Sequence, residues 1–244
     1  HSHHKMAVYN YLFVIIFLVV AAALAVKAGK LTPGGGTAGA IVGLLVFAGG
    51  RYIGLGMLSA FFILGTLATS WKKNEKSPFK AITDRSAKRN AWQVLANGGV
   101  AAAMALLAFL FHHYADIFRL MMAAALSAAT ADTLSSELGM VYGRRFFNIV
   151  TFKKEAKGLD GVISIEGLLI GMLGSAVIAA IVMRSHVGHP WFIMIVLTGT
   201  MGNLADSFLG ALFERKKYIG NDTVNFLNTL VAALAMLVWI VLTR

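Results

Sequence analysis

The chain has no cysteine and only three prolines, and its 11 acidic side chains are half as many as its 22 basic ones. The lack of cysteine excludes disulfides and thiolate metal sites, although it says little about the cellular compartment. Polar residues are also scarce, since 58% of the residues are hydrophobic and the mean hydropathy is +0.72. Several apolar runs reach the roughly 20 residues that cross a bilayer. The composition therefore predicts an all-α polytopic membrane protein.

One integral membrane domain is expected over residues 6–244. The first five residues, His1-Ser2-His3-His4-Lys5, have the composition of an affinity-tag remnant before Met6. No cleavable signal is evident, because the first apolar run is long enough to span a bilayer. The hydrophobic pattern predicts a bundle of about eight transmembrane helices, at about 7–26, 34–49, 52–71, 92–111, 118–141, 162–183, 191–213 and 223–243.

Basic residues alternate between the two sides of this predicted bundle. Seventeen lie in the connections at 27–30, 72–89, 144–157 and 215–217, whereas the opposite side holds only four, Arg51, Arg119, Arg184 and Arg244. Since basic loops stay in the cytoplasm, both termini are expected on the outer side of the membrane. The membrane is expected to be the inner or plasma membrane of a prokaryote. These short loops account for the net charge of +11, so no nucleic-acid partner is expected.

Two aspartates lie inside hydrophobic segments, in the similar phrases Ala131-Asp132-Thr133 and Ala205-Asp206-Ser207. Carboxylates at membrane depth are unfavourable and usually functional. Asp132 belongs to a polar helical stripe near the cytoplasmic end of its span, made of Asp132, Ser135, Ser136 and Gly139. Asp206 borders a second such stripe, made of Asn203, Ser207, Gly210 and Glu214. The outer halves of these spans are almost purely apolar, which predicts a cytoplasm-facing pocket.

A divalent cation would offset the burial of Asp132 and Asp206, and their hard oxygen ligands suit Mg²⁺. The alternative for either aspartate is a structural hydrogen bond between helices. Glu137 points well away from Asp132 on the helix and can pair with a loop cation. It is also expected to contribute to substrate or nucleotide binding, together with Ser136, Asn203 and Ser207.

Further polar residues on the same side of the membrane are candidates for binding phosphate. The loop before the sixth span carries basic, glycine and polar residues that suit an anion, namely Lys153, Lys154, Lys157, Gly158, Asp160, Gly161 and Ser164. The start of the fourth span adds Arg89, Gln93 and Asn97. The start of the eighth span adds Asn221, Asp222 and Asn225. Topology and lipid contacts are the alternative for the basic loop, and core hydrogen bonding is the alternative for Gln93 and Asn97.

Four phrases carry a family resemblance: Gln93 to Gly99, Ala131 to Gly139, Lys157 to Ser164 and Asn221 to Phe226. In this order they resemble the family catalogued as domain of unknown function 92, which includes transmembrane protein 19 and the phytyl-phosphate kinase of vitamin E synthesis. More distantly the chain is similar to dolichol kinase and to CDP-lipid synthases. Asp206 to Lys216 resembles the aspartate phrase of the synthases, with Glu214 where a lysine is expected.

The resemblance implies CTP, or another nucleoside triphosphate, and an isoprenyl monophosphate lipid as the substrates. The expected activity is therefore a Mg²⁺-dependent, CTP-using kinase that converts a phytyl-like monophosphate to the diphosphate. Asp132 and Asp206 would hold the metal, while Lys153, Lys154 and Lys157 would offset charge developing during transfer. Two alternatives remain open at this point, a cytidylyltransferase that makes a CDP-lipid and a membrane transporter.

Overall fold

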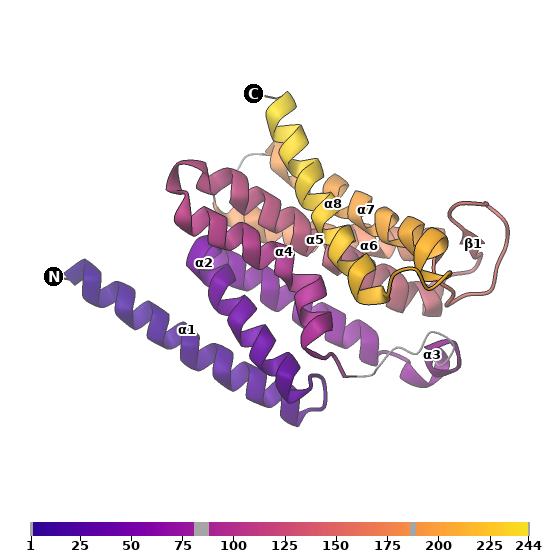
Figure 1. Cartoon of the computed structure of the whole chain (residues 1–244), viewed down its shortest axis with the longest axis horizontal. Coiled ribbons are helices and arrows are strands. Elements are labelled where there is room, and N and C mark those ends of the chain that lie inside the picture. Colours follow the sequence, from indigo (N-terminus) through magenta and orange to yellow (C-terminus); the bar gives the residue numbers. More distant parts are fainter. Residues whose placement is uncertain (1, 81–87, 186–188, 244) are drawn as a thin grey trace.

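The protein forms a helical bundle in a computed structural model that describes residues 2–80, 88–185 and 189–243 (Figure 1). The main helices are α1 Ser2–Lys27, α2 Pro33–Ser70, α3 Lys73–Lys80, α4 Ala91–Leu110, α5 Ala115–Tyr142, α6 Ile165–Val182, α7 His189–Leu209 and α8 Asn221–Leu242. A short 3₁₀ segment at His112–Tyr114 joins α4 to α5, another at Met183–Ser185 follows α6, and α7 ends in a π-helical turn at Gly210–Glu214.

Several helices begin at a side chain that satisfies their first backbone N–H groups. Thr32 Oγ1 accepts from Gly35 N at the start of α2, where Pro33 occupies the first turn and its missing N–H leaves nothing unpaired. Asn90 and Gln93 form a reciprocal capping box at the start of α4. These local signals explain why the apolar runs begin as helices at the residues observed.

Helix α2 consists of two legs that fold back on one another. Arg51 has φ of 53° and ψ of −148°, which interrupts the helix. Lys30 Nζ, just before α2, donates to Ser70 Oγ at its far end over 2.8 Å, whereas the ends of a straight helix of this length would lie about 57 Å apart. The chain therefore reverses at Arg51, and the two legs match the predicted spans 34–49 and 52–71.

Helix α5 lies at the centre of the bundle and packs against α2, α4, α6, α7 and α8. Its residues 120–131 are all buried, and half of them are alanine. Small residues let the neighbours approach closely. A Cβ on Gly139 of α5 would lie 3.0 Å from the Cα of Gly167 in α6, so this helix pair has no room for a side chain at that level.

Seven helices of the described chain are long and apolar enough to cross a membrane, and the two legs of α2 raise the number of crossings to the predicted eight. The chain is an all-α polytopic membrane protein, as its composition predicted. Two features were not predicted, the short helix α3 and a two-residue antiparallel pair, β1 Phe147–Asn148 with β2 Val162–Ile163. In Figure 1 the two termini lie away from α3 and β1, as expected for an even number of crossings.

Candidate functional site

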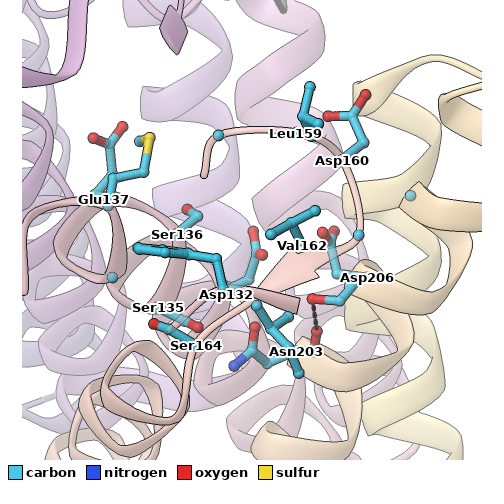
Figure 2. A pocket seen from close by; sticks show the side chains of 18 of the residues that line it. Asp132, Ser135, Ser136, Glu137, Leu159, Asp160, Val162, Ser164, Asn203 and Asp206 are labelled. Carbon is cyan, nitrogen blue, oxygen red and sulfur yellow. Dashed lines mark hydrogen bonds between the residues drawn. The ribbon is translucent and has the colours of Figure 1, made fainter. Parts of the chain in front are cut away.

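A pocket lies at the end of the bundle that carries the basic connections. It encloses a cavity of about 90 Å³, which has room for a cation with its waters or for a phosphate group. The polar and glycine residues that line it are Asp132, Ser135, Ser136, Glu137, Gly139, Gly158, Asp160, Gly161, Ser164, Asn203, Asp206, Ser207, Gly210, Glu214 and Asn221 (Figure 2).

The two aspartates of the predicted metal site line this one pocket from different helices. Asp132 comes from α5 and Asp206 from α7, and each is half-buried. On α5 the rest of the predicted stripe, Ser135, Ser136 and Gly139, accompanies Asp132, and Ser136 Oγ donates to Thr133 O over 3.2 Å. The polar faces of the two helices therefore meet at one depth, as the helical spacing predicted.

The α7 wall ends in an irregular turn. Asn203 is buried, and its backbone oxygen accepts from Ser207 Oγ over 3.3 Å. From Gly210 to Glu214 the helix widens into a π turn, a feature common at functional sites. Gly210, Glu214 and Asn221, at the start of α8, complete this wall.

The loop between β1 and α6 covers the pocket and depends on two glycines. Gly158 and Gly161 have φ of +86° and +74°, conformations that other residues rarely adopt. A Cβ at Gly158 would lie 2.7 Å from the Cβ of Phe79, and a Cβ at Gly161 would overlap Ala211. Both glycines therefore allow the loop to lie directly against α3 and the π turn.

Arg215, which follows the π turn, binds the same loop through hydrogen bonds and an ion pair. Its Nε and Nη2 donate to the backbone oxygen of Asp160 over 3.0 and 2.6 Å, and Nη2 lies 2.8 Å from Glu155 Oε2. Asn148 Nδ2 donates to the other oxygen of Glu155 over 3.1 Å. The hydrogen bond from Arg215 is the main reason why the pKa of Glu155 lies below its ordinary value.

The three predicted lysines occupy different places. Lys153 and Lys154 are exposed and do not line the pocket. Lys157 is half-buried at its edge, where Nζ donates to Met140 O over 3.2 Å and lies 4.7 Å from the centre of the Phe79 ring. Since Met140 and Phe79 both line the pocket, Lys157 is the one of the three lysines that contacts pocket-lining residues.

Glu137 pairs with a loop cation, as its position on the helix suggested, and that cation is Lys76 of α3. Lys76 is only 1% exposed, and its Nζ contacts Glu137 Oε2 over 2.7 Å and donates to the backbone oxygens of Ala68 and Thr69 over 2.6 and 3.2 Å. The pair anchors α3, whose Phe79 lines the pocket. Neither Lys76 nor Phe79 was predicted as part of the site, because nothing in an isolated polar loop indicates which lysine turns inward.

Arg89 lies beside this ion pair and outside the pocket lining. Its guanidinium stacks 5.5 Å from the centre of the Phe61 ring and fits against Gly65, where a Cβ would lie 2.8 Å from Nη2. Burial lowers the pKa of Arg89, and the charge of Glu137 opposes that shift. Arg89 therefore contributes positive charge near Glu137.

Four other predicted residues also lie outside the pocket lining. Gln93 Oε1 accepts from Asn90 N over 3.0 Å, and Asn97 Nδ2 donates to Gln93 O over 2.9 Å, so both side chains have local roles in α4. Asp222 is half-buried and Asn225 buried on α8. Ser164 does line the pocket, and its Oγ also accepts from Gly167 N over 3.1 Å as the cap of α6.

The donor set around the aspartates fits Mg²⁺, which proteins bind through one or two carboxylates together with water and phosphate oxygens. Asp132 and Asp206 supply carboxylates, and the amide of Asn203 and the hydroxyl of Ser207 supply neutral oxygens. The described residues contain no group of three His, Cys, Asp or Glu side chains that could hold a metal by themselves. A cation here would therefore need ligands from water or substrate.

The fold and pocket define an integral membrane protein with an acidic site at one end of its helical bundle. The chain belongs to the integral membrane protein family DUF92, whose model matches residues 16–233. The resemblance predicted from the four sequence phrases is thereby confirmed.

Three relatives show how far this similarity extends. The chain is 39% identical over 233 residues to uncharacterized membrane protein MJ0933 of Methanocaldococcus jannaschii, covering 91% of this chain and 92% of that one. It is 30% identical over 208 residues to the chloroplastic protein VTE6 of Arabidopsis thaliana, covering 81% of this chain and 62% of that one. It is 30% identical to uncharacterized membrane protein sll0875 of Synechocystis, covering 89% and 85%. No solved structure matches the chain.

Proposed function

We propose that the protein is a Mg²⁺-dependent kinase that transfers the terminal phosphoryl group of CTP to an isoprenyl, phytyl-like monophosphate in the membrane. One observation carries the proposal, namely that Asp132 and Asp206 line a single pocket at the basic end of the bundle. The resemblance to the family that includes phytyl-phosphate kinase supplies the nucleotide and the lipid class. The basic connections at this end support a cytoplasmic orientation of the site, where nucleotides are present.

The charge of the pocket supports a cation-dependent reaction. Among the described residues, its lining contains no lysine or arginine and five acidic side chains, which are Asp132, Glu137, Asp160, Asp206 and Glu214. Carboxylates disfavour phosphate oxygens at short range, although Lys76 already offsets the charge of Glu137. Bound Mg²⁺ would reverse this repulsion by bridging carboxylates and phosphate oxygens.

The residues around the pocket then have separate roles in phosphoryl transfer. Asp132 and Asp206 would hold the metal, and Lys157 at the edge would offset negative charge on the transferring group. Gly158 and Gly161 line the pocket, where backbone N–H groups of their loop would approach phosphate oxygens. An oxygen of the lipid phosphate attacks the γ-phosphorus, and the bond from that phosphorus to the β-bridging oxygen breaks, so that CDP leaves. No covalent nucleophile on the protein is needed.

The test uses purified protein in detergent with Mg²⁺, phytyl or farnesyl monophosphate and CTP labelled at either the α or the γ phosphate. Label from the γ position in a lipid diphosphate supports the kinase. Label from the α position, with release of pyrophosphate, would establish a cytidylyltransferase instead. Absence of label in any lipid product, with the protein folded and a panel of other nucleotides also inactive, refutes both reactions.

Substitution of the aspartates tests the metal role. Asp132→Asn and Asp206→Asn should each lower turnover by at least about 100-fold, because each removes a charged ligand, while the melting temperature stays close to that of the parent protein. Asp116→Asn is the matched control, since Asp116 is 92% exposed at the opposite end of α5. Retained activity in both pocket variants would remove the proposed metal site.

A further inference from the structure

The carboxylate of Asp206 is held by a side chain of the neighbouring helix. Asn228 of α8 donates from Nδ2 to Asp206 Oδ1 over 2.9 Å, and Asn228 has no exposed surface. The two helices approach closely here because of Gly202 in α7, where a Cβ would lie 2.8 Å from the backbone oxygen of Asn228. The contact thus belongs to a tightly packed helix interface.

The orientation of the Asn228 amide follows from its partner. A carboxylate oxygen accepts hydrogen bonds, so the NH₂ group must face Asp206 and the carbonyl group must face elsewhere. Asn228 Oδ1 is buried and accepts no hydrogen bond from the described residues. An unpaired buried carbonyl is unfavourable, and an apolar side chain of similar size would avoid it. Packing alone therefore does not account for an asparagine at this position.

We infer that Asn228 is a positioning residue that fixes the Asp206 carboxylate at the pocket wall and thereby raises the affinity of the pocket for a divalent cation. The inference rests on the proposed function, since it concerns the metal of that reaction. Removal of a group that hydrogen-bonds to a metal ligand and orients it typically lowers metal affinity by about 10- to 100-fold. Asn221 and Asn225 lie on the same face of α8, at spacings of seven and three residues from Asn228, and Asn221 lines the pocket.

The experiment titrates the purified protein with Mn²⁺ alone and follows bound metal by electron paramagnetic resonance, with no nucleotide or lipid present. The parent protein should bind Mn²⁺, and Asp206→Asn should lose this binding. Asn228→Leu, which keeps the volume and removes the donor, should weaken binding about 10- to 100-fold. Asn228→Ala is the second variant, in case leucine does not pack.

Thr229→Val is the matched control. Thr229 is the next residue on α8, is equally buried, and donates from Oγ1 to Phe226 O of the same helix over 2.8 Å. Its substitution should leave Mn²⁺ affinity within about threefold of the parent. If the Asn228 variants lose thermal stability as Thr229→Val does but bind Mn²⁺ like the parent, Asn228 is merely structural and the inference fails.

Kinetics separate this inference from the proposed function. In the labelled-CTP assay, Asn228→Leu should raise the Mg²⁺ concentration for half-maximal rate about tenfold or more and leave the half-saturating lipid concentration nearly unchanged. A parent protein that binds no Mn²⁺ in the absence of nucleotide overturns this inference, whereas the labelled-CTP assay decides the kinase separately. A parent protein that binds Mn²⁺ but transfers no phosphate overturns the kinase alone, and the binding titration of the variants still decides the role of Asn228.

Discussion

Replacing Lys76 with methionine should detach α3 from the bundle. Lys76 is buried to 1% exposure, yet it lies on an eight-residue helix whose other residues are mostly exposed. Its ammonium group contacts Glu137 over 2.7 Å and donates to two backbone oxygens at the end of α2. Methionine has a similar length and no charge, so the substitution removes all three interactions while retaining most of the packing.

The magnitude follows from what remains behind. Removal of one partner from a buried ion pair costs roughly 3–5 kcal/mol, because the other charge stays buried without compensation. Glu137 is only 12% exposed, which supports a value in this range, but the nearby charge of Arg89 compensates part of the loss. We therefore expect about 3 kcal/mol, or a melting temperature lower by about 6–12 °C for a chain of this size.

Thermal unfolding in detergent, followed by tryptophan fluorescence, measures the global effect, and limited trypsin digestion measures the detachment of α3. Lys73→Met is the matched control, since Lys73 lies on the same helix and is exposed. Adding Glu137→Gln to Lys76→Met should restore part of the stability, because it removes the uncompensated charge. If Lys76→Met and Lys73→Met unfold at the same temperature and are cleaved at the same rate, the ion pair does not anchor α3.

Gly161→Ala should lower the yield of folded protein, because Gly161 has φ of +74° and no room for a Cβ, whereas Gly220→Ala, where a Cβ meets open space, should not; equal yields of monodisperse protein would contradict this. Arg51→Gly should raise stability by about 1 kcal/mol by relieving a positive φ, as measured by thermal unfolding, and a lower melting temperature would show that the Arg51 side chain matters more. Acidification should release the loop that Glu155 holds. The pKa of the Glu155 carboxyl is lowered in the folded protein from its ordinary value of 4.5. The ion pair therefore stabilises the loop fully above pH 4.5, and this stabilisation is lost as the pH falls through the lowered pKa. Pepsin cleavage of the loop should therefore rise at acidic pH, and Arg215→Gln should remove most of that pH dependence.

Much of the fold could be predicted because membrane helices are specified by long apolar runs. Even the reversal inside α2 was visible, since the apolar pattern breaks near Arg51. The pocket walls on α5 and α7 were predictable for a similar reason. Once two helices are placed at the same depth, the positions of Asp132 and Asp206 within them determine which end of the bundle they share.

The loops resisted prediction because their conformation depends on tertiary contacts. The lysine-rich segment before α6 offers three cations with the same local chemistry, and only the fold brings Lys157 against Phe79 and leaves Lys153 and Lys154 exposed. Likewise Gln93 looked like a pocket residue because it lies at the membrane face, but its side chain caps α4. A polar residue in the first turn of a helix has this local alternative, which pattern alone does not exclude.

The pocket is lined by acidic residues although the whole chain is basic, so the few acidic residues of the chain are unevenly distributed. The chain carries a net charge of +11, yet five of its 11 acidic residues line one pocket. Basic residues are distributed by topology, since they accumulate in every connection on one side of the membrane. Acidic residues have no such general requirement and are unfavourable at membrane depth. The pocket therefore gathers acidic residues in a basic chain, and a search for the cationic surface suggested by net charge would have led to the loops and away from the pocket.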